Sequence, residues 1–263
     1  KLLFGRAAMP KIDVLLEGYG LGTNVGTIGF CSVILIEGEK RLLFDSAHVG
    51  RRTFLQAALA ERGLAPTDID AQVLSHAHWD HVQNCDLFDH APLLVHHSER
   101  KYASKPHRND WATPKWTGAV IEMMDLQEVG EGEQVMPGVR VLELPGHSPG
   151  SIGLEVETDD GVCLIAGDAI HNARVAAAGR SPLVFWNEKQ ANDSIRRCVE
   201  SGNLIYPGHD RPFTLENGIA KYRGDFAVTV TGVAPGVEGA TFVAQPPLAE
   251  PWIMPGIEEQ RIE

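Results

Sequence analysis

The chain has 263 residues, of which 43% are hydrophobic and 22% are charged, so it can form a sizeable buried core. Its formal net charge of -12 would repel a phosphate backbone, and no stripe of basic and aromatic residues is visible, so we expect no nucleic-acid partner. The sequence contains no apolar run of about 18 residues, so we expect no membrane span.

The start of the chain and the cysteines bear on the compartment. The opening stretch, KLLFGRAAMPKIDVLLEG, lacks the sustained apolar segment and the cleavage site of a secretory signal. The cysteines are widely spread and form no CxxC pair, so we expect buried free thiols and not structural disulfides. A cytoplasmic location is the resulting expectation.

The first half of the chain predicts strands, then a helix, then strands again. The runs FCSVILIE and RLLFD, at residues 30–37 and 41–45, predict a hairpin. Residues 51–62 have the apolar spacing of a helix, and Gly63 is suited to follow its end. AQVLSH and PLLVHH predict short buried strands, and HVQNCDLF can begin a helix between them. Residues 101–122 are expected to be irregular.

The second half repeats this coarse order. VRVLELPGH, SIGLEVET, GVCLIAGDA and NLIYPGHD predict strands, and residues 187–200 predict a helix. We expect residues 1–224 to form one catalytic domain. Residues 225–263 are rich in glycine, proline and alanine with isolated large apolar residues, so we predict an extended arm. This arm would pack on the domain or on a neighbouring subunit of a homo- or hetero-oligomer, and a disordered tail is the alternative.

One short stretch, LSHAHWDHVQN, places four strong metal ligands directly after an apolar run. Three further candidates each follow a predicted strand beside a glycine, where the backbone can turn tightly and direct a side chain into a cleft. The seven candidates are His76, His78, Asp80, His81, His147, Asp168 and His209. A single histidine in such a place is usually a surface residue, but four separate elements of this kind together indicate a metal site.

The spacing of the first four candidates indicates two ions. His76 and His78 are two residues apart, so in an extended stretch they point the same way, whereas Asp80 and His81 can face a second position. Five imidazoles and two carboxylates exceed the needs of one four-coordinate ion. The histidines without this context are expected to be structural or superficial, and these are His48, His90, His96, His97 and His107.

The string HAHWDH at residues 76–81, followed by His147, Asp168 and His209, resembles the motif of the metallo-β-lactamase superfamily. The resemblance covers roughly residues 29–210 and implies an α+β fold, a four-layer αββα sandwich of two mixed sheets flanked by helices. It also implies the distribution of ligands over the two ions. The first ion would be held by His76, His78 and His147, the second by Asp80, His81 and His209, and Asp168 would bridge them.

Within the superfamily, the chain is most similar to the N-acyl homoserine lactonases and related small-molecule hydrolases. His78 stands where flavodiiron oxygen reductases carry glutamate, and Asp168 supplies a bridge that true β-lactamases lack. The pair of glycines that continues the motif in glyoxalase II is missing, and the acidic charge is unlike ribonuclease Z. The lactonases often have a tyrosine three residues after the bridging aspartate, where this chain has His171.

The resemblance implies a dinuclear hydrolase that uses a metal-bridging hydroxide on a small organic substrate, such as a lactone or a carboxylic ester. Zinc suits the ligand set best, and iron or manganese would also fit. Asp80 can orient the hydroxide, and His171 is a candidate donor to the substrate. Trp111 and Trp116 could roof the cleft over an apolar substrate.

The open alternatives use the same ligands in a different pocket. They are an aryl ester or ether hydrolase, a thioesterase, a phosphodiesterase, and a non-catalytic metal-binding partner subunit. The phosphodiesterase would need a cation near the site, for which Arg174, Arg180 and Arg211 are candidates. The non-catalytic alternative is disfavoured because a degenerate binder would usually have lost some of the seven ligands.

Overall fold

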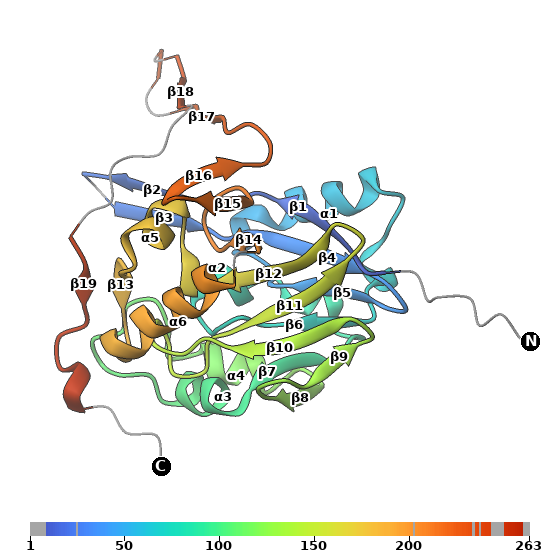
Figure 1. The fold of residues 1–263 in the computed structure, drawn as a ribbon, viewed down its shortest axis with the longest axis horizontal. Coiled ribbons are helices and arrows are strands. Elements are labelled where there is room, and N and C mark those ends of the chain that lie inside the picture. The colour runs from blue at the N-terminus through green and yellow to red at the C-terminus, as the bar shows by residue number, and fades with distance from the viewer. Residues whose placement is uncertain are drawn as a thin grey trace, which may run out of the picture.

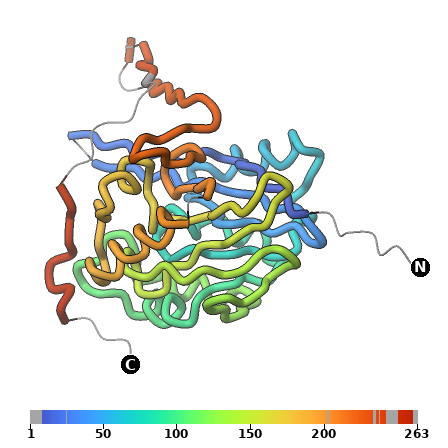
Figure 2. Tube along the Cα trace, in the orientation of Figure 1, coloured from blue at the N-terminus to red at the C-terminus, as the bar shows by residue number. Residues whose placement is uncertain are grey.

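A computed structural model describes residues 9–24, 26–201, 203–232, 235–236, 238–242 and 250–259. Two β-sheets lie face to face, and helices cover their outer faces (Figure 1). Figure 2 shows that the chain completes the first sheet, in blue to green, before it begins the second, in yellow-green to orange.

The first sheet has six strands in the order β1-β4-β5-β6-β7-β8. These strands are β1 (Lys11–Leu16), β4 (Val33–Glu37), β5 (Arg41–Phe44), β6 (Ala71–Val73), β7 (Leu93–His96) and β8 (Leu126–Val129). The pairs β1–β4 and β4–β5 are antiparallel, whereas β5 to β8 run parallel. The carboxyl ends of the parallel strands therefore meet at one edge of this sheet.

The second sheet has seven strands in the order β16-β15-β14-β12-β11-β10-β9. These strands are β9 (Gln134–Met136), β10 (Val139–Glu143), β11 (Ile152–Thr158), β12 (Gly161–Gly167), β14 (Leu204–Pro207), β15 (Phe213–Glu216) and β16 (Ile219–Tyr222). Only β12 and β14 are parallel neighbours among these pairs of described strands. Both strands consequently end at the same edge.

The core follows the alternation of side chains along the central strands. In β4, Ile34 and Ile36 point into the core between the two sheets, whereas Val33 and Leu35 pack under the outer helices. β5 and β12 alternate in the same way. Both faces of these strands are buried, which explains why their sequences are continuous apolar runs and not alternating ones.

Helices form the two outer layers. They are α1 (Arg52–Glu61), α3 (His97–Ser104) and α4 (Thr117–Ile121) on the first sheet, and α5 (Ala173–Ala178) and α6 (Glu188–Glu200) on the second. Leu55 and Leu59 of α1 are completely buried, and Ile195 of α6 packs against the second sheet. The predicted four-layer αββα sandwich is confirmed.

The predicted hairpin at residues 30–37 and 41–45 is formed by β4 and β5. Its first strand starts only at Val33, because Phe30 ends a separate hairpin made of β2 (Tyr19–Thr23) and β3 (Gly26–Phe30). The sequence did not reveal this earlier hairpin, whose glycine-rich strands carry a weak strand signal. The four cysteines are buried free thiols, as expected.

The two long helices predicted at residues 51–62 and 187–200 are confirmed as α1 and α6. The expectation that residues 101–122 are irregular was wrong, since α3 ends there and α4 lies within the segment. His96 begins α3 because its Nδ1 accepts a hydrogen bond from the Ser98 amide. A Cβ at position 118 would collide with the backbone at Ser104, so α4 packs closely on α3 through Gly118.

The described part of the C-terminal segment forms two features. β17 (Val228–Val230) and β18 (Ala240–Phe242) make a hairpin that projects from the sandwich (Figure 1). Further on, β19 (Trp252–Ile253) pairs in parallel with β13 (Leu183–Val184) at the side of the domain. Residues 233–234, 237, 243–249 and 260–263 of the predicted arm lie outside the described residues.

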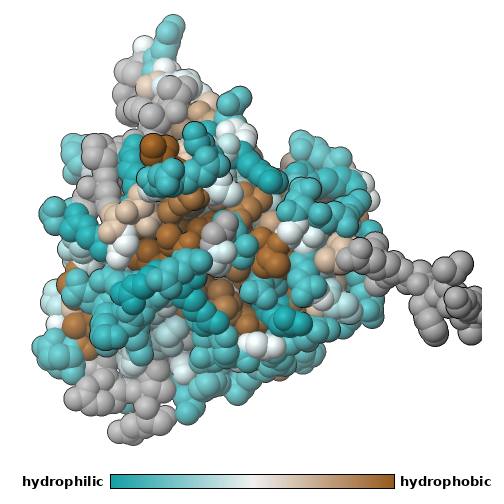
Figure 3. All heavy atoms as spheres, in the orientation of Figure 1, coloured by the Kyte–Doolittle hydropathy of each residue, from teal (hydrophilic) through white to brown (hydrophobic). Residues whose placement is uncertain are grey.

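The surface is largely hydrophilic at the margins of the face drawn in Figure 3, with apolar residues gathered near its middle. Within the described ranges, no helix combines the length and the apolar character that crossing a membrane requires.

Candidate metal centre

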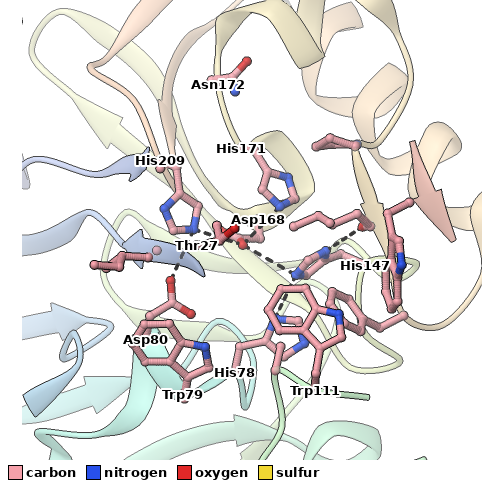
Figure 4. A pocket seen from close by; sticks show the side chains of 18 of the residues that line it. Thr27, His78, Trp79, Asp80, Trp111, His147, Asp168, His171, Asn172 and His209 are labelled. Carbon is pink, nitrogen blue, oxygen red and sulfur yellow. Dashed lines mark hydrogen bonds and ion pairs between the residues drawn. The ribbon is translucent and has the colours of Figure 1, made fainter. Parts of the chain in front are cut away.

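The seven predicted ligands lie in loops or short helical turns that follow strands of both sheets. His76 and His78 follow β6, Asp80 and His81 lie in α2 (Trp79–Val82), His147 follows β10, Asp168 follows β12, and His209 follows β14. Figure 4 shows that side chains from the two sheets turn toward one another across the same space. The sandwich therefore brings all seven together at one edge.

The ligand atoms form two clusters that fit two ions. The first cluster contains His76, His78, His147 and Asp168, and the second contains Asp80, His81 and His209. Within each cluster the candidate ligand atoms lie within 4.8 Å of one another, and every residue is buried. The resemblance implies the same two sets of histidines and Asp80, but with Asp168 as a bridge between the two ions and not as a member of the first set alone.

Asp168 lies between the clusters. Its Oδ2 is 3.5 Å from His147 Nε2 and 3.9 Å from His76 Nε2 in the first cluster. The same oxygen is 3.2 Å from His209 Nε2, and Oδ1 is 3.5 Å from His81 Nε2, both in the second cluster. One carboxylate thus faces imidazoles of both clusters, which is the position that a bridging ligand requires.

Two histidines are oriented by hydrogen bonds to backbone carbonyls at the far side of the ring. The Nδ1 atoms of His147 and His209 lie 2.8 Å from the carbonyl oxygen of Leu183 and 3.0 Å from that of Phe30. Since a carbonyl can only accept, these Nδ1 atoms donate, and in the neutral form of each ring the Nε2 atom keeps a lone pair that faces the cluster. Such outer hydrogen bonds fix the tautomer and the direction of a metal-binding imidazole.

Several polar atoms of the clusters are buried without a hydrogen-bond partner among the described residues. They are the Nε2 atoms of His76, His78 and His81 and the Oδ1 atom of Asp168. Unsatisfied buried polar atoms are costly, and native proteins rarely tolerate several in one place. The donor set, its convergence and these unpaired atoms fit bound divalent ions.

The protonation states of the first cluster suit metal binding. Burial lowers the pKa of His78 and His147 to about 3, so both imidazoles are neutral at pH 7. Burial alone would raise the pKa of Asp168, but the facing imidazoles, His209 and His171 foremost, hold it well below its usual value. Neutral imidazoles and ionised carboxylates are the forms that coordinate metals. In the second cluster, burial alone would lower the pKa of His81 and His209, but the facing acidic groups outweigh burial and raise it, so bound ions would have to displace these protons.

Asp45 supports His81 from behind, a contact that sequence reasoning missed. Its Oδ2 lies 2.7 Å from His81 Nδ1, and it also accepts hydrogen bonds of 2.8 Å from the amide and the hydroxyl of Ser75. Cys31 lies close to this pair. Burial strongly raises the pKa of its thiol, so we interpret this group as a support for His81 and not as a third metal site. The only signal in the sequence was an acidic residue at the end of the apolar run RLLFD.

Glu99 in α3 is a second support that the sequence did not reveal. It is completely buried, and its Oε1 accepts a 2.8 Å hydrogen bond from the amide of Ala77, between two ligands. Its Oε2 accepts hydrogen bonds of 2.7 Å from the Ser148 hydroxyl and 2.9 Å from the Gly150 amide. One carboxylate therefore joins the loop of the first sheet to the loop that carries His147.

Two glycines allow the backbone to approach the carboxylate ligands. A Cβ at Gly208 would collide with Oδ1 of Asp168, and a Cβ at Gly29 would collide with Oδ2 of Asp80. Gly29 belongs to β3, so the β2–β3 hairpin closes directly over the second cluster.

His171 faces the same space as the ligands (Figure 4). Its Nε2 is 3.3 Å from Asp168 Oδ2, and its ring lies 4.8 Å from that of His147. Burial lowers its pKa to about 3, so the imidazole is neutral at pH 7. In the described structure its Nδ1 has no hydrogen-bond partner. The side chain can therefore offer a donor or an acceptor to a bound molecule.

The clusters open into a pocket of about 390 Å³. Trp79 and Trp111 line it, whereas Trp116 does not. Of the three arginines considered above, only Arg174 is among the lining residues, and Arg180 instead pairs with Glu250.

The other predicted nonligands lie apart from the pocket lining. His90 and His97 are exposed, and His96 and His107 lie beside acidic residues outside the clusters. His48 is packed near the site, with its ring 5.3 Å from that of Trp79.

A sandwich of this kind, with a histidine and aspartate centre at one edge, defines the class of metallo-β-lactamase-fold proteins. The sequence model of the metallo-β-lactamase superfamily matches residues 26–209, and the chain belongs to that superfamily.

Relatives in the superfamily include proteins of different kinds. Metallo-beta-lactamase domain-containing protein 1 of Xenopus laevis is 32% identical over 212 residues, which cover 78% of this chain and 82% of that protein. The N-acyl homoserine lactonase of Bacillus thuringiensis is 28% identical over 153 residues, which cover 56% of this chain and only 58% of the lactonase.

Solved structures show the same fold. The Bacillus thuringiensis lactonase with bound N-decanoyl-L-homoserine has a TM-score of 0.63 at 22% identity, over 78% of this chain and 94% of that one. The dizinc lactonase AidC has a TM-score of 0.63 at 16% identity, over 76% of this chain and 81% of that one.

Proposed function

We propose that this protein is a dinuclear metal-dependent hydrolase of small organic substrates with a lactone or carboxylic ester bond. The observation that carries the proposal is the position of Asp168, whose two oxygens face imidazoles of both clusters at 3.2–3.9 Å. A carboxylate in this place is suited to hold two ions at the separation that a two-metal hydrolase uses. We propose zinc as the ion, because the set is made of imidazoles and carboxylates.

Ions bound in the clusters would supply a water with its pKa lowered from about 15.7 towards about 7 and would polarise the substrate carbonyl. The carboxylates of Asp80 and Asp168 would offset part of the positive charge of these ions. Hydrolysis adds the water oxygen to the carbonyl carbon, breaks the bond to the leaving oxygen and delivers a proton to it. Asp80 lines the pocket, which supports the role of orienting the water.

His171 is the residue that we propose as the donor to the substrate. It stands where the lactonases often have a tyrosine, and its neutral ring faces the pocket beside Asp168. A hydrogen bond from this ring would strengthen as negative charge develops on the carbonyl oxygen. The pocket-facing position supports the role, and the contact with Asp168 keeps the ring beside the clusters.

An aryl ester hydrolase is the second candidate function. The aromatic rings in the pocket lining, including Trp79 and Trp111, favour it, because such rings bind flat apolar groups. Both candidates use the same clusters and the same bond cleavage, so they differ only in the group attached to the ester.

Metal content and activity test the function together. Protein purified without chelator and reconstituted with zinc should hold about two ions per chain, and should hydrolyse members of a panel of lactones, alkyl esters and aryl esters. Asp168→Ala should lose metal and most activity, whereas His97→Ala, which replaces an exposed histidine, should retain both. A metal content well below one after reconstitution, or equal behaviour of the two variants, would contradict the proposal.

A further inference from the structure

We infer that the pocket selects substrates with a planar aromatic group, and that the C-terminal segment supplies one of the rings that bind it. The inference rests on the proposed hydrolase function for the bond that is cleaved. Three rings carry it, namely Trp111, Phe185 and Trp252, and we call them the aromatic wall. All three are among the residues around the pocket. Trp111 and Trp252 keep exposed surface, whereas Phe185 is completely buried and supports them from behind.

The rings of the aromatic wall contact one another, edge to face for the two pairs that include Trp111 and tilted for Phe185 and Trp252. Their centroids are 5.3 Å apart for Trp111 and Phe185, 5.0 Å for Phe185 and Trp252, and 5.8 Å for Trp111 and Trp252. The planes are inclined at 53–67°, so the rings are not stacked face to face. Trp111 is 53% exposed and lines the pocket into which the clusters open. A large apolar surface left open inside a pocket indicates a place where an apolar ligand binds.

The C-terminal segment is held firmly enough to form a wall. The amide of Trp252 donates a 2.8 Å hydrogen bond to the Pro182 carbonyl, and the amide of Met254 donates a 2.9 Å bond to that of Val184. Met254 itself is only 1% exposed and packs against Phe185. Strand pairing and a buried anchor on one side of Trp252 therefore fix its backbone in the domain.

Polar contacts hold the same segment on both sides of Trp252. Glu250 pairs with Arg180 at 3.1 Å, and Glu259 pairs with Arg108 at 2.8 Å. These pairs are exposed and contribute little free energy by themselves. Together they connect the segment to the domain both before and after Trp252 in the sequence.

The aromatic wall lies on the side of the first metal cluster. The ring of Phe185 is 4.6 Å from that of His78 and 5.4 Å from that of His147. In addition, His147 Nδ1 contacts the carbonyl of Leu183, a residue of the strand that pairs with Trp252. An aromatic group on the wall would consequently sit next to the centre, with the attached carbonyl within reach of the clusters.

The size and shape of the pocket favour a compact ring over a long chain. Its volume of about 390 Å³ lies near the lower end of the range of about 300–1,000 Å³ for small-molecule sites. Inclined rings attract the faces and edges of another aromatic ring, a preference that a saturated ring of the same size cannot satisfy. On the far side, Thr27 and Asn172 supply polar groups (Figure 4).

Trp252 lies outside the segment that matches the superfamily, which ends at residue 209. The clusters lie within the part of the chain that matches the superfamily, whereas this ring of the wall lies beyond it. We therefore assign to Trp252 a role in substrate selection and none in the chemical step.

Binding of product analogues to the zinc-loaded protein tests the inference. Phenylacetate and cyclohexylacetate have the same carboxylate and rings of similar size, but only the first is aromatic. Calorimetry should show phenylacetate binding about threefold to tenfold more tightly. Equal affinities in the wild-type protein would overturn the inference.

Two substitutions then locate the preference. Trp252→Leu should reduce the ratio of the two affinities toward one, and Trp252→Phe should keep most of it. Trp116→Ala is the matched control, because this tryptophan is 49% exposed and does not line the pocket. A ratio that Trp252→Leu leaves unchanged, in protein with a wild-type melting temperature, would also overturn the inference.

The esters of the same two acids separate this inference from the proposed function. The kcat/KM ratio for their methyl esters should follow the affinity ratio across the variants. If neither ester nor any other substrate is hydrolysed while phenylacetate keeps its preference, the hydrolase function fails and the aromatic selectivity stands. If both esters are hydrolysed equally well, the selectivity fails and the hydrolase function stands.

Discussion

The carboxylate of Glu99 accepts a 2.7 Å hydrogen bond from the hydroxyl of Ser148, the residue next to the ligand His147. The same carboxylate binds the amide of Ala77, between the ligands His76 and His78. All these groups are buried. Glu99 thus ties together two loops that originate from different sheets, and it does so without being a ligand itself.

Glu99→Gln should weaken both the fold and the metal centre. The Glu99 carboxylate accepts hydrogen bonds from three groups, and the NH₂ group of glutamine would face at least one of these donors. A buried donor left without an acceptor costs about 1–3 kcal/mol. Loss of such an outer support typically lowers metal affinity by about 10–100-fold. Thermal unfolding and zinc titration measure the two effects. Wild-type values in both would show that the carboxylate is dispensable.

Gly29→Ala should affect the second ion selectively. The new Cβ would collide with the end of the Asp80 side chain, which can rotate away at little cost to the fold but then ceases to be a ligand. We expect the metal content to fall from about two ions toward about one, with a nearly unchanged melting temperature. Gly22→Ala is the control, because a Cβ at Gly22, in the same hairpin, meets nothing within 4 Å. Full occupancy of both ions in Gly29→Ala would refute this account.

Replacement of His171 should lower kcat more than it raises KM. If the ring donates to the developing oxyanion, its loss costs about 10²–10³ in kcat. His171→Gln keeps a donor and His171→Phe keeps only bulk, so the glutamine variant should be the more active of the two at full metal occupancy. Equal activities would assign the residue to packing beside Asp168.

The metal-free protein should lose stability as the pH falls below about 6.5, the ordinary pKa of histidine in an unfolded chain. Burial lowers the pKa of His78, His147 and His171 to about 3, so between these values the unfolded chain binds protons that the folded chain does not. Each such proton lowers the free energy of unfolding by about 1.4 kcal/mol per pH unit. Denaturant unfolding of chelator-treated protein between pH 7 and pH 4 measures this slope, and a flat profile would disprove the buried neutral state.

The candidate ligands could be predicted from the sequence because their signals are local. A candidate ligand beside a glycine at the end of an apolar run can be recognised within a stretch of a few residues. His76, His78, Asp80 and His81 lie in one such short stretch. The four-layer sandwich could be predicted because the pattern of these ligands resembles the motif of the metallo-β-lactamase superfamily.

The supports of the site could not be predicted, because their contacts join distant segments. Glu99 reaches Gly150 across 51 positions of the chain, and Trp252 pairs with Leu183 through backbone atoms that have no sequence signature. The short helix α4 was missed for a related reason, since a five-residue helix is formed by its packing on α3 and not by its own propensity.

The two-residue strand β13 connects Trp252 with the ligand His147. It pairs with the strand that contains Trp252, and the carbonyl of its Leu183 contacts His147. A substitution at Trp252 can therefore change which substrates the pocket binds, while the loops that carry the metal ligands keep their sequences. Substrate specificity could thus be altered by exchange or extension of that segment, with the reactive centre left unchanged. A library confined to residues 250–254 would search this variation in the laboratory.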